Sequence, residues 1–133
     1  MKEVLEIIRN NVLYVAIGLF FIWKFYKYFR TKKTLKEIVS KGNYQLVDVR
    51  SIGEFHSNSI PHSLNLPIDQ ISQGHMKIDK DKDIIIYCAS GARSAMARLQ
   101  LLKLGYKNIV NGGGIGHVSR IIEGALNEEN HNM

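Results

Sequence analysis

The sequence predicts an α/β fold, an open parallel sheet flanked by helices, preceded by one N-terminal transmembrane helix. Short apolar runs at 45–49, 84–87 and 109–111 alternate with segments of helical periodicity. This alternation is typical of a parallel sheet with helices packed on its faces. The N-terminal helix is predicted from twelve consecutive residues, 12–23, that are all apolar or glycine.

The N-terminal run is predicted to span a membrane over residues 12–29, after a short segment of residues 1–11. Twelve apolar residues are fewer than the roughly 18 to 20 that cross a bilayer, but the aromatic residues and snorkelling lysines that follow extend the run. Trp23, Tyr26 and Tyr28 would form an interfacial belt. No small-residue cleavage pattern follows, which argues against a signal peptide. An amphipathic helix on a soluble protein is the alternative.

Charge predicts the orientation of this span. Six basic residues follow the apolar run with no acid among them: Lys24, Lys27, Arg30, Lys32, Lys33 and Lys36. They equal the formal net charge of +6, since the other twelve basic and twelve acidic residues cancel. The positive-inside rule then places the C-terminal domain in the cytoplasm, as in a single-pass protein of the bacterial inner membrane. Residues 12–36 are expected to contact lipid, and no nucleic-acid partner is expected.

The remaining elements follow from turns and periodicity. Residues 30–33 are predicted to be a basic linker, and 34–37 resemble a capping box that opens a helix ending near Ser40. The domain over 34–126 would hold further helices at 51–56, 68–73, 92–104 and 115–126, with Gly105 closing the third of these. The polar residues 127–133 are expected to be a frayed tail.

Cys88 directly follows the apolar run 84–87 and begins the segment Cys-Ala-Ser-Gly-Ala-Arg-Ser, residues 88–94. A strand, a small-residue loop and a helix N-terminus would surround the sulfur with backbone N–H groups and partial positive charge. These surroundings favour the thiolate, so Cys88 is predicted to be a nucleophile. It also stands at the carboxyl end of a strand, where parallel sheets place active sites. A small buried hydrophobe is the alternative.

Cysteine and histidine usage limits the chemistry further. Cys88 is the single cysteine, so neither an internal disulfide nor an internal resolving thiol is available, and any exchange must involve another molecule. The histidines lack metal-ligand spacing, so no metal and no cofactor are expected. They are scattered along the chain, at His56, His62, His75, His117 and His131.

The loop from Cys88 through four residues to Arg93 resembles the active-site loop of the rhodanese (sulfurtransferase) homology domain. The similarity covers about residues 34–122, with motifs in the same order. The other matching segments are 46–50, which ends in Asp-Val-Arg, the acidic-aromatic pair Glu54-Phe55, and the stretches 60–67, 104–109 and 112–115.

This resemblance implies a thiosulfate sulfurtransferase that forms a persulfide on Cys88. The donor would be thiosulfate or a protein persulfide, and the acceptor a thiol or cyanide. Arg93 would either steer an anionic donor or pair with an acid such as Glu54. Substrate would be bound by the amides and side chains of Ala89, Ser90, Gly91, Ala92, Arg93 and Ser94, and structural support would come from Asp48, Arg50 and Glu54.

Two other functions stay open at this point. One is a membrane-tethered persulfide carrier or interaction module with little turnover of free substrate. The other is a cysteine phosphatase or arsenate reductase, since a cysteine, a ring of amides and an arginine also bind tetrahedral oxyanions. The active-site loops of cysteine phosphatases follow the pattern Cys-x5-Arg. That pattern is one residue longer than the segment from Cys88 to Arg93.

Overall fold

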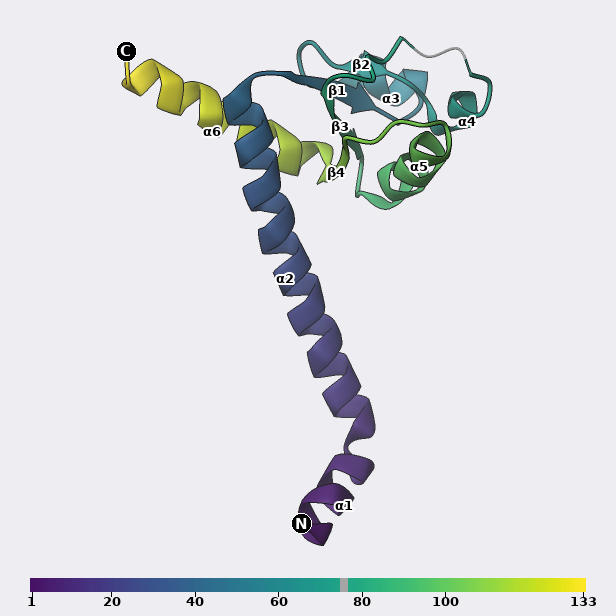
Figure 1. The fold of residues 1–133 in the computed structure, drawn as a ribbon, viewed down its shortest axis with the longest axis vertical. Helices are drawn as coiled ribbons and strands as arrows, with labels where there is room; N and C mark the ends of the chain where they lie inside the picture. Colours follow the sequence, from purple (N-terminus) through teal and green to yellow (C-terminus); the bar gives the residue numbers. More distant parts are fainter. Residues whose placement is uncertain (75–76) are drawn as a thin grey trace. The chain divides into compact units, whose positions relative to one another are not determined.

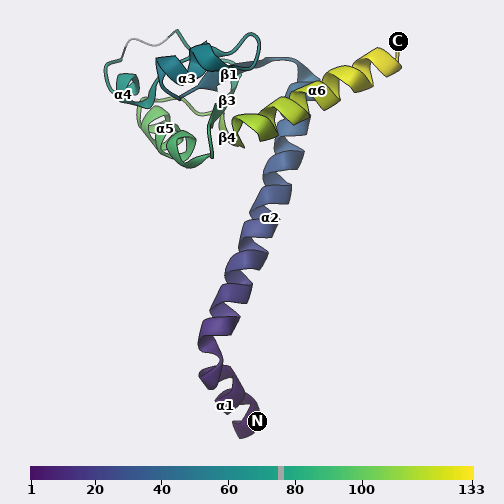
Figure 2. The ribbon, with the colours of Figure 1, turned by 180° about the vertical axis from the view of Figure 1, so that it is seen from behind.

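A computed structural model describes residues 1–74 and 77–133, and for residues 31–33 it describes the backbone only. His75 therefore lies outside the described residues, as do the side chains of Lys32 and Lys33 in the predicted basic cluster. The chain divides into two compact units, Met1–Lys32 and Lys33–Met133. Each unit is described by itself (Figures 1 and 2).

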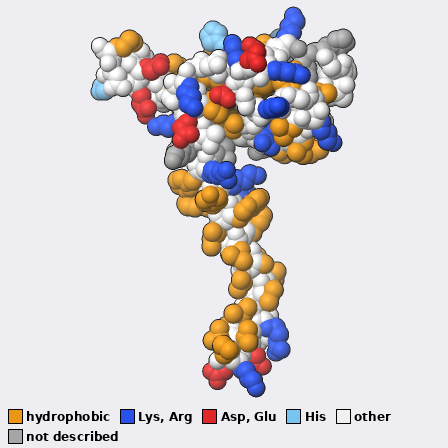
Figure 3. All heavy atoms as spheres, viewed as in Figure 1, with side chains coloured by type: hydrophobic (Ala, Val, Ile, Leu, Met, Phe, Trp, Pro, Cys, Tyr) orange, Lys and Arg blue, Asp and Glu red, His pale blue; other side chains and the backbone are white. Residues whose placement is uncertain are grey.

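The first unit holds helix α1 (Lys2–Asn10) and most of α2 (Val12–Lys41). Asn11 separates them: its backbone N–H and its Nδ2 both donate to the carbonyl of Ile7, at 3.1 and 2.8 Å. The large apolar side chains between Val12 and Phe29 are exposed (Figure 3). By length and composition α2 is able to cross a membrane, with a mean hydropathy of 1.4 in its most apolar window.

The basic linker expected at 30–33 is wrong as secondary structure. Helix α2 continues without a break through these residues to Lys41, so the helix expected to open at Thr34 is its last part. No glycine or proline lies between Leu19 and Lys41, so nothing in this stretch ends a helix. Gly42, in the left-handed region at φ 74°, follows the last helical residue.

The second unit contains a four-stranded sheet in the order β2-β1-β3-β4, with every pairing parallel. This confirms the predicted fold class. The strands are β1 (Tyr44–Asp48), β2 (Leu64–Asn65), β3 (Asp83–Cys88) and β4 (Ile109–Gly114). Strand β2 was not predicted because two residues are too few to carry a periodic signal.

Helices flank this sheet as the sequence predicts. Among the described residues of this unit, the helices that follow β1 are α3 (Ile52–Ser57), α4 (Ile68–Ile71), α5 (Ala92–Lys103) and α6 (Ile115–His131), and the C-terminal part of α2 packs with them. The Ser51 hydroxyl caps α3 by accepting from the Glu54 N–H. Helix α6 runs five residues beyond Leu126, so most of the expected frayed tail is helical.

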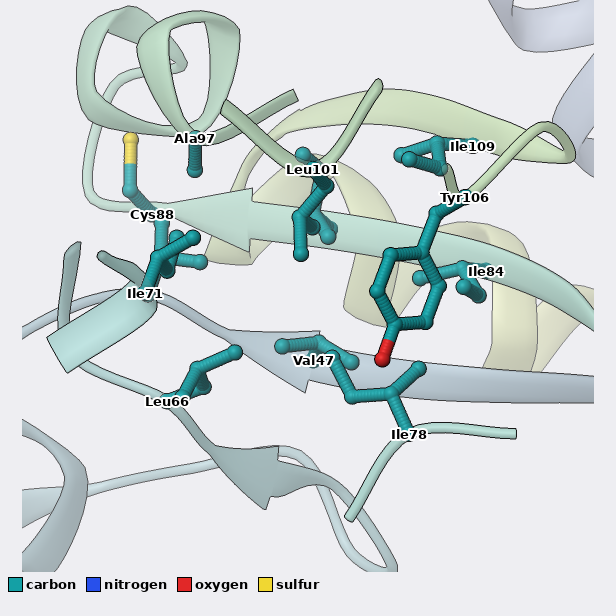
Figure 4. Packing of buried hydrophobic residues seen from close by; sticks show 12 residues of the cluster. Val47, Leu66, Ile71, Ile78, Ile84, Cys88, Ala97, Leu101, Tyr106 and Ile109 are labelled. Carbon is teal, nitrogen blue, oxygen red and sulfur yellow. The ribbon is translucent and has the colours of Figure 1, made fainter. Parts of the chain in front are cut away.

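Alternate residues of β3 pack into two hydrophobic clusters, so both faces of this strand are buried, as in other parallel sheets. Ile84, Ile86 and Cys88 share one cluster with Ala97 and Leu101 of α5 (Figure 4). The second cluster contains Ile85 and Tyr87 from β3, with Leu35 from α2 and Val118, Ile121 and Ile122 from α6. The strand therefore ends at Cys88 between two buried clusters.

Candidate active site

Cys88 is the last residue of β3, and a three-residue turn leads from it into α5. In Figure 4 its sulfur points away from Ile71 and Leu66, toward the side of the strand on which α5 lies. The Gly91 N–H donates to Sγ at 2.9 Å. Gly91 has φ 97°, a left-handed conformation that favours glycine, and a Cβ there would lie 3.1 Å from the Gly113 Cα.

The polar surroundings of Sγ favour the thiolate, although the residue is only 1% exposed. Burial is the largest single influence, and it raises the pKa of Cys88. The Ser94 hydroxyl, whose Oγ lies 3.6 Å from Sγ, acts in the opposite direction. Backbone N–H groups of Ser94, Ser90 and Gly91 add to it, and together the hydrogen bonds lower the pKa below its ordinary value.

Ser94 links the sulfur to β4. This buried hydroxyl lies 3.0 Å from the Gly91 carbonyl and 2.7 Å from Asn111 Oδ1. Asn111 was missed by the sequence analysis. The available signal was an amide side chain inside the otherwise apolar run 109–111, because a polar side chain in such a run needs hydrogen-bond partners when it is buried.

Arg93 pairs with Glu54, one of the two roles the sequence left open. Its two terminal nitrogens donate to the two carboxylate oxygens at 2.7 and 3.0 Å, in a bidentate geometry. These hydrogen bonds from Arg93 hold the pKa of Glu54 at about 2, and Glu54 in turn raises the pKa of Arg93. Both side chains are more than a third exposed, so screening by water limits the strength of the pair.

Asp48 and Arg50 form a buried pair at the end of β1. The Arg50 Nη2 donates to Asp48 Oδ2 at 2.7 Å and to the Asn58 carbonyl at 2.5 Å. Asn65 adds Nδ2 hydrogen bonds to the carbonyls of Asp48 and Arg50. The pair thus ties β1 to the segment after α3 and to β2, contacts that stabilise the scaffold around the site.

Three further loop residues lie around the sulfur without side-chain contacts of their own to it in the described structure. Ala89, Ser90 and Ala92 are exposed. Of the three, Ser90 contributes its backbone N–H, which helps to lower the pKa of Cys88. Within residues 1–74 and 77–133, no cluster of three or more His, Cys, Asp or Glu is suited to hold a metal ion.

Comparison with known proteins identifies relatives of this arrangement. Residues 31–115 match the family model described as Rhodanese-like domain. The chain is 44% identical over 71 residues to a sulfurtransferase of Allochromatium vinosum, covering 53% of this chain and 66% of that protein. It is 27% identical over 73 residues to the thiosulfate sulfurtransferase GlpE of Coxiella burnetii, covering 55% of this chain and 68% of that protein.

A solved structure agrees with these matches. The human single-domain sulfurtransferase TSTD1 superposes with a TM-score of 0.54 at 26% identity, over 62% of this chain and 85% of that one. The matched region is only part of several curated relatives. Three of them are matched over 66%, 41% and 56% of their own lengths.

Proposed function

Because the chain belongs to the rhodanese-like domain family, we propose that it is a thiosulfate sulfurtransferase with Cys88 as its nucleophile. One observation carries the proposal: the Cys88 sulfur stands at the carboxyl end of β3 and accepts the Gly91 N–H at 2.9 Å. A lowered pKa at this position raises the fraction of thiolate at any given pH, and the thiolate is the nucleophilic form. The relatives named sulfurtransferase support the same reaction class.

The first step loads sulfur onto the enzyme. The Cys88 thiolate attacks the outer sulfur of thiosulfate and forms a new S–S bond. The S–S bond of thiosulfate breaks, and sulfite leaves with its electron pair. Cys88 is then a persulfide whose terminal sulfur carries the negative charge. The N–H groups of the loop 89–94 supply positive dipoles for that charge, as oxyanion holes do.

The second step transfers the sulfur from the Cys88 persulfide to an acceptor. A cyanide ion or a thiolate attacks the terminal sulfur of the persulfide, and the bond to Cys88 Sγ breaks. The electron pair returns to Sγ, which regenerates the starting thiolate. No second cysteine in the chain competes for the sulfur, so the acceptor comes from outside. Turnover therefore requires both a sulfur donor and an external acceptor.

Mass spectrometry of the full chain tests this reaction. After incubation with thiosulfate, the wild type should gain the mass of one sulfur atom, and cyanide should remove it with release of thiocyanate. The Cys88→Ser variant should show neither change. A wild-type chain that gains no sulfur from thiosulfate or from a protein persulfide would overturn the proposal.

A persulfide carrier with little turnover of free thiosulfate is a second candidate, and the Arg93 geometry favours it. Both terminal nitrogens of Arg93 are held by Glu54, which diverts this guanidinium from an anionic donor. Comparing the two loading rates decides between the candidates. Loading by a protein persulfide much faster than by thiosulfate favours the carrier, and comparable rates favour the thiosulfate enzyme.

The same proposal includes a membrane anchor. The eighteen residues 12–29 rise about 27 Å as a helix, close to the thickness of the hydrocarbon core. Their large apolar side chains are exposed, and the positive-inside rule applied to the basic residues that follow in sequence supports a domain on the cytoplasmic side of a bacterial inner membrane. Protease treatment of intact and of opened spheroplasts tests this: the domain should be digested only in the opened ones.

A further inference from the structure

Asn111 occupies an unusual position in β4. It pairs in register with Ile86 of β3, and Ile109, two residues earlier, belongs to the cluster that also holds Ile86 and Cys88. Because strand side chains alternate, Asn111 lies on the face of the sheet that carries Cys88. An amide side chain at such a place requires hydrogen-bond partners.

Each polar atom of the Asn111 side chain has a partner. Its Oδ1 accepts from the Gly113 N–H at 2.9 Å and from the Ser94 hydroxyl at 2.7 Å. Its Nδ2 donates to the Gly91 carbonyl at 3.3 Å. If the amide were flipped, Nδ2 would face the Gly113 N–H, which is another donor, and Oδ1 would face the Gly91 carbonyl, which is another acceptor. These two backbone groups therefore fix the orientation of the amide.

One partner of Asn111 donates directly to the sulfur. Gly91 donates its N–H to Cys88 Sγ at 2.9 Å while its carbonyl accepts from Asn111 Nδ2 at 3.3 Å. Ser94 has a single hydroxyl proton and lies 3.6 Å from Sγ. Its Oγ also lies 3.0 Å from the Gly91 carbonyl and 2.7 Å from Asn111 Oδ1, so the sulfur and these two oxygens compete for the one proton.

The backbone of β4 also approaches the loop closely. The register with β3 shifts between Ile86 and Tyr87, so that Gly112 is an extra residue in β4. A Cβ on Gly114 would lie 2.7 Å from the Ala89 carbonyl oxygen, so no side chain fits there. Asn111 thus reaches the loop from a segment whose glycines are in backbone contact with it.

We propose that Asn111 is a positioning residue, which holds Gly91 through its carbonyl so that the Gly91 N–H remains against Cys88 Sγ. The role rests on the proposed sulfur transfer, in which the charge moves from Sγ to the terminal sulfur and back. A loop fixed by Asn111 keeps the Gly91 N–H in place through both states. Asn111 does not touch the substrate in this role and acts through Gly91.

The pH dependence of Cys88 alkylation by iodoacetamide in the full chain tests this role. Because Cys88 is the single cysteine, the reaction reports on it alone. In Asn111→Leu the midpoint should rise by about one pH unit, because hydrogen bonds to the thiolate lower its pKa. Asn108→Leu, at an exposed position just before β4, is the matched control and should leave the midpoint unchanged.

The charged groups around the sulfur are the same in both variants. Arg93, which interacts electrostatically with Cys88, keeps its partner Glu54. Asp48 and Arg50 likewise stay paired. A shift in the midpoint then reports on the donors of the loop.

A double variant with Ser94→Ala separates the Gly91 contact from the hydroxyl. In this background the competing proton is absent, so Asn111→Leu acts through Gly91 alone and should still raise the midpoint. An unchanged or lowered midpoint in folded Asn111→Leu, in either background, would overturn the role. Should circular dichroism show that Asn111→Leu is unfolded, the smaller change Asn111→Ser carries the test, with a rise in the midpoint expected again.

Failure of this inference and failure of the proposed reaction are distinguishable. Alkylation requires no sulfur donor, so a wild-type chain that forms no persulfide would refute the reaction and still allow the test of Asn111. Conversely, normal persulfide formation with an unchanged alkylation midpoint in Asn111→Leu would remove only the role of Asn111.

Discussion

Glu54 and Arg93 join the first turn of α3 to the first turn of α5 through two hydrogen bonds of 2.7 and 3.0 Å. Their separation in sequence is 39 residues. The pair fixes the helix that follows the Cys88 loop to the segment that follows β1. It also makes the stability of the domain depend on pH.

Replacing Glu54 with Gln should reduce the loss of stability in acid. Arg93 holds the pKa of Glu54 at about 2, below the ordinary 4.5, so the carboxylate stabilises the fold fully above pH 4.5. This contribution disappears as the pH falls toward 2. Melting temperatures of the full chain across this range should therefore fall less steeply in Glu54→Gln than in the wild type. Parallel curves would contradict the role of the pair.

Gly91→Ala should cost both stability and reactivity. A non-glycine residue at φ 97° is strained by roughly 1–2 kcal/mol, and the added methyl would press on Gly113 from 3.1 Å. The displaced N–H would no longer reach Sγ, so alkylation of Cys88 at neutral pH should slow. Gly42→Ala is the control, with a similar φ of 74° but open space around the added atom. Equal rates of alkylation in the two variants would show that the Gly91 contact has no effect on the sulfur.

Gly112→Ala should destabilise the domain by overpacking. Its Cβ would lie 2.6 Å from a methyl of Val118 and 3.2 Å from one of Ile85, which predicts a loss of about 1–3 kcal/mol in urea unfolding. Adding Val118→Ala removes the closest clash, so the double variant should lose less than the sum of the two single losses. Strict additivity would locate the strain elsewhere.

Arg50→Met should be among the most destabilising substitutions in the domain. Asp48 is fully buried, and removal of its partner leaves an uncompensated charge at a cost of about 3–5 kcal/mol. Adding Asp48→Asn to this variant removes the charge and should restore part of the loss, as measured by urea unfolding. A double variant less stable than Arg50→Met would refute this explanation.

Phe21→Asp should weaken retention in the membrane. The side chain is exposed near the middle of the segment 12–29, and an aspartate at the centre of a spanning helix costs about 3 kcal/mol. The variant should appear in the soluble fraction after an alkaline carbonate wash. Val4→Asp, in α1 and outside the segment, should leave the wild-type distribution unchanged. Retention of both variants would argue against a span at 12–29.

The parts of the site that the sequence predicted are local ones. Apolar run, cysteine, small residues and helical periodicity follow one another within residues 84–102, so the strand, the loop and the helix were accessible from spacing alone. The sequence left two roles open for Arg93, pairing with Glu54 or steering an anionic donor, because only the fold brings α3 and α5 together.

The parts that were missed depend on tertiary contacts. Asn111 reaches Ser94 across 17 residues of sequence, and no periodicity reveals the shift of register that follows Asn111 in β4. The helix boundary expected at Thr34 failed for another reason: a capping pattern does not start a new helix where the preceding residues are already helical. The amino-acid composition could not distinguish one continuous helix from two helices joined by a linker, because both arrangements use the same residues.

The extra residue in β4, Gly112, also affects whether a strand of another chain is able to pair with the edge of the sheet. Strand β4 is an outer strand of the sheet, and such strands offer unpaired backbone groups to neighbouring chains. Its irregular ladder and its run of glycines, Gly112 to Gly114, make a poor template for an added strand. The strand at the opposite edge of the sheet, β2, is only two residues long. Both features oppose edge-to-edge aggregation of the domain.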